Sequence, residues 1–177
     1  LFGSYNVGKA RYPGQTTFDV AAVIQPGITV PSLKVGHIQP SVGMRHDDHT
    51  MFSRREVAMN ATPLLAPNYN EWGAEITYEG LRWLTLNAGA YSASNLAESE
   101  PAVDASQPSY LWRVQLWPQF FEEGINTQIG GSWYGNDQFQ MATGFGGFGV
   151  ADRATFFAEA TYSRNAIGRQ IRNWMVQ

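Results

Sequence analysis

The densest group of side chains that could carry out chemistry lies in one short stretch before the middle of the chain. Its members are Arg45, His46, Asp47, Asp48 and His49, followed by Arg54, Arg55 and Glu56. Two histidines and a carboxylate can bind Zn²⁺ or Fe²⁺. Neighbouring residues of an extended loop point apart, however, and no third ligand stands at a supporting spacing. The pattern therefore favours a loop held by arginine–aspartate pairs, and the sequence predicts no metal site and no cofactor.

Hydrolytic chemistry has little support in the sequence. Hydrolases that cleave lipids or peptides without a metal ion hold a serine or an aspartate within hydrogen-bonding reach of a histidine. His49 and Ser53 are four residues apart, but no nucleophile turn surrounds them. The glycine-rich stretch 144–149 lacks the lysine and the following helix of a phosphate-binding loop. We therefore predict that the chain is not an enzyme.

The segments that must position these residues alternate between apolar and polar side chains. In residues 70–80, Trp72, Ile76 and Tyr78 fall on one row, and Glu75 and Glu79 fall on the other. Side chains of a strand point alternately to its two faces, so one face suits hydrocarbon and the other suits water. We predict nine such strands, at about residues 1–8, 16–26, 29–38, 70–79, 81–92, 109–118, 124–134, 138–149 and 153–163.

Two other local patterns are less regular. The glycines of 144–149 indicate a tight bend or a close approach of two backbones. Helical periodicity is weak and limited to residues 56–65 and to the tail after Ile167.

Long connections, at about 39–69 and 93–108, alternate with short turns along the chain. This alternation is typical of outer-membrane barrels, which have long loops at one end and short turns at the other.

Composition points to the same class. Aromatic residues make up 14% and charged residues only 15% of the 177 residues, against about 25% charged in typical soluble domains. There is no apolar run near 20 residues, which excludes a transmembrane helix. The net charge is −3 and no basic run is present, so nucleic acid is not an expected partner. The absence of cysteine excludes disulfides.

These observations predict one all-β domain over residues 1–177, an antiparallel transmembrane β-barrel. Bacterial single-chain barrels have even strand numbers, so nine strands indicate an incomplete portion of a larger barrel. The alternative is a closed, narrow eight-stranded barrel with one segment misassigned. The chain begins at Leu1 without a visible signal peptide, which fits either a removed signal or a fragment.

A family resemblance rests on residues 33–55, LKVGHIQPSVGMRHDDHTMFSRR. A strand ending in V-G-x-x-x-P-x-x-G before an arginine-containing loop resembles the phosphate-selective porin O and P family. Residues 72–96, WGAEITYEGLRWLTLNAGAYSASNL, resemble the following hairpin of that family. The DDHT variant also resembles porin-like barrels that bacteria pair with multihaem cytochromes. The resemblance implies an outer-membrane pore of about 16 strands, trimeric in its best-known members, that passes small anions.

The charges argue against carrying over phosphate selectivity. The chain has 12 Lys+Arg against 15 Asp+Glu, which favours a weakly cation-preferring or non-selective pore. The side chains expected to face the lumen are Glu75, Glu79, Arg113 and Glu159. The long loop 39–69 is expected to fold into the lumen, where its charges form the constriction. The aromatics expected at the membrane interfaces are Trp72, Tyr78, Tyr110, Trp112, Trp133 and Tyr162.

Three functions remain open on the sequence alone. The first is a porin-like channel for small solutes or ions in the outer membrane of a Gram-negative bacterium. It would contact membrane lipid and form a homotrimer or a complex with other outer-membrane proteins. The second is a non-conducting barrel that serves as a scaffold or sheath for an electron-transfer cytochrome. The third is a soluble carbohydrate-binding β-sandwich, because the strands of a sandwich also alternate between apolar and polar side chains.

Overall fold

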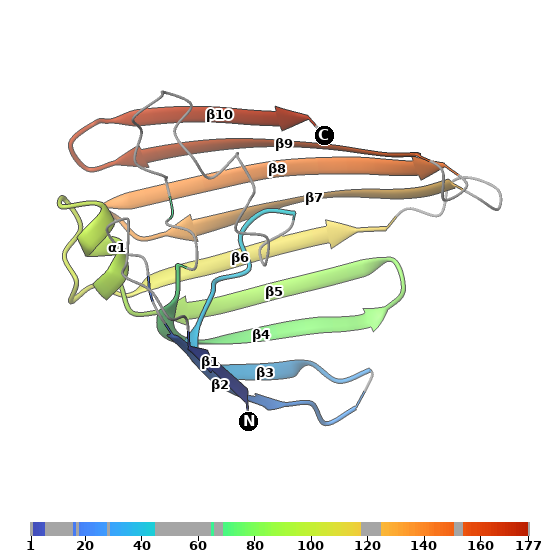
Figure 1. The fold of residues 1–177 in the computed structure, drawn as a ribbon, viewed down its shortest axis with the longest axis horizontal. Helices are drawn as coiled ribbons and strands as arrows, with labels where there is room; N and C mark the ends of the chain where they lie inside the picture. The colour runs from blue at the N-terminus through green and yellow to red at the C-terminus, as the bar shows by residue number, and fades with distance from the viewer. Residues whose placement is uncertain are drawn as a thin grey trace.

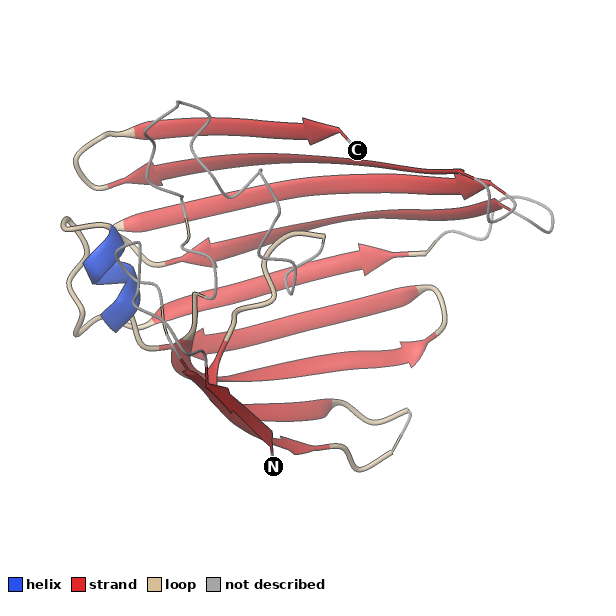
Figure 2. Cartoon of the chain, viewed as in Figure 1, coloured by secondary structure: helices blue, strands red, loops and turns tan. Residues whose placement is uncertain are grey.

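A computed structural model describes residues 2–5, 16, 18–27, 29–44, 65, 69–117, 125–150 and 154–176. The described strands form one open antiparallel sheet in which each strand pairs with its neighbours in chain order (Figures 1 and 2). The strands are β1 (Phe2–Tyr5), β2 (Phe18–Ile24), β3 (Ser32–Ile38), β4 (Glu71–Leu81), β5 (Leu84–Tyr91), β6 (Ser109–Leu116), β7 (Ile125–Gly135), β8 (Phe139–Val150), β9 (Ala154–Asn165) and β10 (Gln170–Val176). The described part has one helix, α1 (Ser94–Ser99). The all-β, antiparallel prediction is confirmed at this level.

Two elements differ from the expectation. The tail after Ile167, expected to be weakly helical, forms strand β10, because the edge of β9 supplies its backbone hydrogen-bond partners. Helix α1 lies within the long connection 93–108, where no helix was expected. The weak helical period at 56–65 falls outside the described residues, apart from Leu65. None of the described helices is long and apolar enough to cross a membrane.

The glycine-rich stretch 144–149 does not bend the chain. It lies in the second half of β8, which pairs without a register shift with both β7 and β9. Backbone lies close to Gly147, where a Cβ would be 2.8 Å from the Phe156 oxygen, and two glycines of the sheet make room for aromatic rings. A Cβ on Gly130 would lie 2.5 Å from Cζ of Phe145, and a Cβ on Gly147 would lie 2.4 Å from Cδ1 of Phe157. Glycines opposite aromatics in this way are a known device of sheets.

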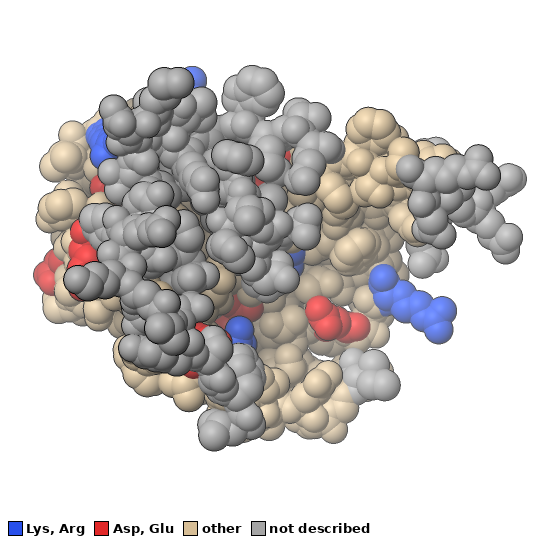
Figure 3. Space-filling model, in the orientation of Figure 1, with Lys and Arg blue, Asp and Glu red and all other residues tan. Residues whose placement is uncertain are grey.

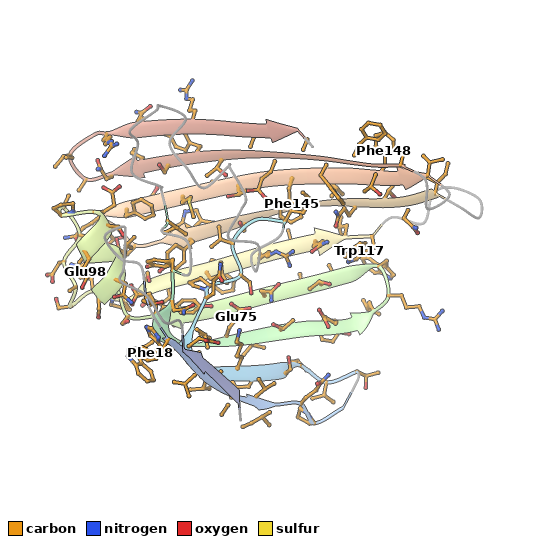
Figure 4. The ribbon with its side chains drawn as sticks, in the orientation of Figure 1. Phe18, Glu75, Glu98, Trp117, Phe145 and Phe148 are labelled. Carbon is orange, nitrogen blue, oxygen red and sulfur yellow. The ribbon has the colours of Figure 1, made fainter. Side chains whose placement is uncertain are left out.

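The two ends of the sheet carry different connections. The end at which α1 lies, here called the α1 end, holds both long connections and the short turns 136–138 and 166–169. The opposite end, here called the far end, holds the connections 25–31, 82–83, 117–124 and 151–153. Figure 4 shows Glu98 at the α1 end, and Trp117 and Phe148 at the far end.

The two faces of the sheet have opposite exposure. On one face, here called the covered face, the side chains are buried beneath connecting segments, and on the other, the outer face, they are exposed. In β6 the residues alternate strictly between buried and exposed. An apolar core lies under the covered face near α1, formed by Ala21, Ile38, Val42, Leu65, Tyr69, Tyr91, Ala93, Leu96, Val103, Leu111, Tyr134, Phe139 and Met141.

Candidate functional site

The candidate site is the middle of the covered face, where residues 39–44 cross the sheet after leaving β3. Figure 1 shows this segment, in cyan, passing in front of the central strands. Its polar anchors come from four strands, namely Glu75 of β4, Arg113 of β6, Ser132 of β7 and Glu159 of β9. All four side chains are buried. The segment therefore bridges strands that are far apart in the sequence.

Glu75 anchors the start of the segment. Its carboxylate accepts hydrogen bonds from the Ser41 hydroxyl (2.6 Å) and the Ser41 backbone N–H (3.2 Å). The Asn87 amide donates to the same carboxylate at 2.9 Å, and so does the Tyr91 hydroxyl. Only 3% of Glu75 is exposed. Four donors compensate for the water that this buried carboxylate has lost.

Arg113 holds the other end of the segment by its backbone carbonyls. Its Nε donates to the Gly43 oxygen at 2.9 Å, and one Nη donates to the Met44 oxygen at 3.5 Å. The remaining donors reach Asn87 (3.1 Å) and Gln115. The guanidinium also lies 5.3 Å from the centre of the Phe145 ring. Figure 4 shows Glu75 and Phe145 over the middle of the sheet, away from both ends.

Glu159 and Ser132 complete the anchorage through backbone N–H groups. Met44 N–H donates to Glu159 Oε2 at 2.8 Å, and Gly43 N–H donates to the Ser132 hydroxyl at 2.9 Å. Gly43 has φ +78°, and a Cβ there would lie 2.8 Å from Glu159 Oε2. Only glycine fits this position without strain or displacement.

A second buried carboxylate, Glu71, fixes helix α1 at the α1 end. It accepts hydrogen bonds from the backbone N–H groups of Asn95 and Leu96, both at 2.8 Å, and from the Ser92 hydroxyl at 2.6 Å. Ala93, the residue before the helix, supplies no side-chain cap. The first turn of every helix has backbone N–H groups without a partner inside the helix. In α1 two of them are satisfied by Glu71, which belongs to β4.

The Glu71 network continues into the apolar core. The Tyr69 hydroxyl donates to Glu71 at 2.9 Å and lies 2.9 Å from the Tyr134 hydroxyl, which in turn lies 2.9 Å from the Ser109 hydroxyl. Burial raises the pKa of Tyr69 well above its usual value, and Tyr134 and Glu71 raise that pKa further. Tyr69 therefore keeps its proton and stays a donor to the carboxylate.

Acidic side chains also gather on the surface near the α1 end. Figure 3 shows them in red over α1 and the turns beside it. Glu98 and Asp104 are exposed there, whereas Glu100 is buried and accepts a hydrogen bond from Asn165 at 3.0 Å. Among the described residues, no group of three or more histidine, aspartate or glutamate side chains could hold a metal ion.

The outer face carries the predicted aromatics. Its large exposed side chains include Trp72, Tyr110, Trp112 and Tyr162, while Tyr78 and Trp133 are partly exposed. Trp112 pairs with Trp133, and one register row continues from there through Ala142 to Tyr162. Most of these aromatics are closer to the α1 end than to the far end.

A second aromatic group, which the sequence interpretation missed, lies at the far end. It consists of Trp83, Trp117, Phe148 and Phe156, all exposed. Their positions, in a turn or within three residues of one, were the signal that could have identified them. The rings of Phe148 and Phe156 stack with centres 5.1 Å apart, and Trp117 N–H donates to the Trp83 oxygen at 2.8 Å.

The distance between the two aromatic groups follows from positions within single strands. Tyr162 and Phe156 are six positions apart in β9, and Trp117, just after β6, follows Trp112 by five positions. Six positions span about 20 Å along a strand. The apolar band between the two groups is therefore about 20 Å long in the strand direction.

An apolar groove of about 490 Å³ opens on this band. Its walls include the outward side chains Ile76, Leu86, Trp112 and Trp133, and Gly131 lies in its lining. The outward positions of β5–β9 contain no aspartate or glutamate. The outer face is thus apolar along most of its described length.

The structure separates the sequence-predicted site residues into three groups. Arg45, His46, Asp47, Asp48, His49, Arg54 and Arg55 lie outside the described residues. Glu75, Arg113 and Glu159 lie together on the covered face, beneath residues 40–44, whereas Glu79 is exposed. The carboxylates of Glu75 and Glu159 bind the chain itself, so they do not support the cation preference inferred from their sign. Sequence reasoning missed Glu71, Asn87 and Ser132, because their partners are distant in the sequence.

Comparison with known proteins adds no relative: no family model, curated protein or solved structure matches the chain.

Proposed function

We propose that this chain is part of an outer-membrane β-barrel that acts as a porin-like channel for small solutes or ions. The observation that carries the proposal is the inverted polarity of the sheet. The exposed face is apolar, with 62% of Trp112 and 55% of Ile129 accessible, while charged and amide side chains are buried on the covered face. A soluble monomer rarely exposes so large a contiguous apolar face, whereas lipid-facing barrels require one.

The segment after β3 supports a narrowed interior. Residues 41–44 are held against the covered face by Glu75, Arg113 and Glu159. A barrel of about 16 strands leaves an aqueous channel, and a segment fixed in this way would reduce its cross-section. The continuation of the same loop carries Asp47 and Asp48, which we propose as part of the constriction.

The apolar core near α1 favours a second candidate, a barrel that does not conduct. Helix α1, the Tyr69–Tyr134 pair and the neighbouring apolar residues fill the covered face at the α1 end. Such a barrel would serve as a scaffold or sheath for a partner, such as an electron-transfer protein. A soluble carbohydrate-binding sandwich has less support, because a sandwich would bury the apolar face of the sheet and not the charged one.

Conductance in planar lipid bilayers tests the proposal. The full-length protein, refolded in detergent and added to the bilayer, should give stable single-channel steps. Replacing both acidic loop residues, Asp47→Asn with Asp48→Asn, should shift the reversal potential in a salt gradient toward anion permeation, because two negative charges leave the constriction.

The matched control is Glu98→Gln, which removes one exposed negative charge from α1 and should leave the reversal potential unchanged. Inserted protein without channel steps would favour the sheath. Channel steps with an unchanged reversal potential in the double variant would contradict the assignment of the loop as the constriction. Protein that remains soluble and folded without detergent would contradict the barrel itself.

A further inference from the structure

Two arginines stand on the outer face of the last two described strands, near the α1 end. Arg164 of β9 pairs with Gln170 of β10, and Arg172 of β10 pairs with Tyr162 of β9. The arginines are therefore diagonal neighbours, with Cα atoms about 7–8 Å apart. Both side chains are exposed. Arg164 is the only charged residue at the outward positions of β5–β9, and Arg172 lies beside it in β10.

The arginines lie at the level of the aromatic group near the α1 end. Arg172 shares the register row of Tyr162, Ala142, Trp133 and Trp112. Its guanidinium carbon lies 6.0 Å from the centre of the Tyr162 ring. In membrane proteins, such aromatics sit at the headgroup level. Arginines at this depth would face the headgroups and not the hydrocarbon.

A polar hollow of about 380 Å³ lies beside Arg164. Gln138 and Gln140 line it together with Arg164 and can present amide donors, while Asp137 is its carboxylate. The amide of Asn165, which also lines it, is already bound to Glu100. Guanidinium and amide donors suit phosphate oxygens, and arginine binds phosphate in a bidentate manner. On the far-end side of Arg164 and Arg172, the surface is apolar and consists of small residues and rings, including Ala142, Gly144 and Ala160.

We propose that this surface binds an anionic phospholipid, with its headgroup phosphate at Arg164 and Arg172 and its acyl chains along β8 and β9. The inference rests on the proposed membrane location of the outer face. A free phosphate ion would use only the polar hollow, whereas a phospholipid uses the hollow and the adjoining apolar surface. The charge of the two arginines and the apolar surface beside them therefore favour the lipid.

Lipid binding to the full-length protein tests the inference. The protein, refolded in a neutral detergent, is titrated with phosphatidylglycerol or phosphatidylcholine, and native mass spectrometry measures the bound fraction. Wild type should prefer phosphatidylglycerol. Each basic residue near an anionic lipid surface contributes about 1 kcal/mol, or about fivefold in affinity. Arg164→Gln with Arg172→Gln should therefore lower the preference by roughly 25-fold.

Two further variants calibrate the result. Arg82→Gln removes an exposed arginine from the far-end turn 82–83 and should leave the preference unchanged. Asp137→Asn removes the carboxylate of the hollow and should strengthen phosphatidylglycerol binding. An unchanged preference in the double arginine variant would overturn the inference. Equal loss in Arg82→Gln would also overturn it, since the effect would then reflect net charge alone.

Flotation with vesicles of neutral phosphatidylcholine separates this inference from the proposed function. Wild type that floats but shows no phosphatidylglycerol preference would overturn the headgroup site and leave the barrel proposal standing. Wild type that does not float would overturn both. Displacement of phosphatidylglycerol by millimolar inorganic phosphate would indicate a free-phosphate site and would overturn the lipid assignment.

Discussion

At the scale of single residues, the covered face depends on charged side chains that are buried and fully engaged. Removing one member of such a network leaves its partners buried without a hydrogen bond, at a cost of about 1–3 kcal/mol for an unsatisfied group. Arg113→Met would leave the Gly43 and Met44 carbonyls and the Asn87 amide oxygen without this donor. We expect it to lower the free energy of unfolding by about that amount in urea titrations of the refolded protein.

Arg82→Met is the matched control for this prediction, because Arg82 is an exposed arginine in the far-end turn. Exposed substitutions usually change stability by no more than about 0.5 kcal/mol. If the two variants unfolded at the same urea concentration, the guanidinium of Arg113 would not be what holds residues 43 and 44.

The chain offers a matched pair of glycines for a second prediction. Gly43 and Gly168 both have positive φ, +78° and +83°. A Cβ on Gly43 would lie 2.8 Å from Glu159 Oε2, whereas a Cβ on Gly168 would meet nothing within 4 Å. Alanine at either position incurs the left-handed penalty of roughly 1–2 kcal/mol, but Gly43→Ala must also displace Glu159 from Met44 N–H.

We therefore expect Gly43→Ala to be more destabilising than Gly168→Ala, by about 1–3 kcal/mol for the disturbed hydrogen bond to a charged group. Urea midpoints of the two variants, compared at equal slope, measure the difference. Equal midpoints would show that Glu159 moves aside without loss and that its bond to residue 44 contributes little.

At the scale of elements, α1 is fixed by a residue that belongs to a strand. Glu71→Met removes both acceptor oxygens, so the N–H groups of Asn95 and Leu96, which donate to the same carboxylate oxygen, lose their acceptor. Loss of a helix cap costs about 0.5–2 kcal/mol. We expect the amides of Asn95 and Leu96 to exchange with solvent at least several times faster, as hydrogen exchange measures.

Glu98→Met provides the matched control, because Glu98 lies on α1 but is exposed. It should leave both amides protected as in wild type. If Glu71→Met also left them protected, the docking of α1 would depend on the burial of Leu96 in the apolar core and not on the carboxylate.

The elements also show what the sequence could predict. Strands such as β4 and β6 were predictable because one face is apolar and the other polar. Apolar and polar residues therefore alternate along the sequence of each strand. Helix α1 has only six residues, and its cap comes from Glu71, so no local signal marks it. The anchorage of Met44 by Glu159 joins residues 115 positions apart, and only the pairing of the seven strands from β3 to β9 brings them together.

At the scale of the whole molecule, the apolar outer face leads to a prediction that depends on depth. Val114 is 43% exposed and lies two residues from Trp112, between the two aromatic groups. If this face meets lipid, Val114→Arg should reduce the free energy of unfolding in vesicles by about 2–4 kcal/mol. Gln140→Arg lies on the same face at the level of the aromatics near the α1 end, where an arginine costs about 0–1 kcal/mol.

The difference between these two variants is decisive because both add the same side chain to the same face. On a water-exposed sheet, neither position would require desolvation of the guanidinium, and both changes should fall within about 0.5 kcal/mol of wild type. In a bilayer, the cost must rise toward the middle of the apolar band, because the arginine can reach the headgroups from position 140 but not as readily from position 114. Unfolding titrations in phosphatidylcholine vesicles that gave equal values for both variants would contradict a lipid-facing outer face.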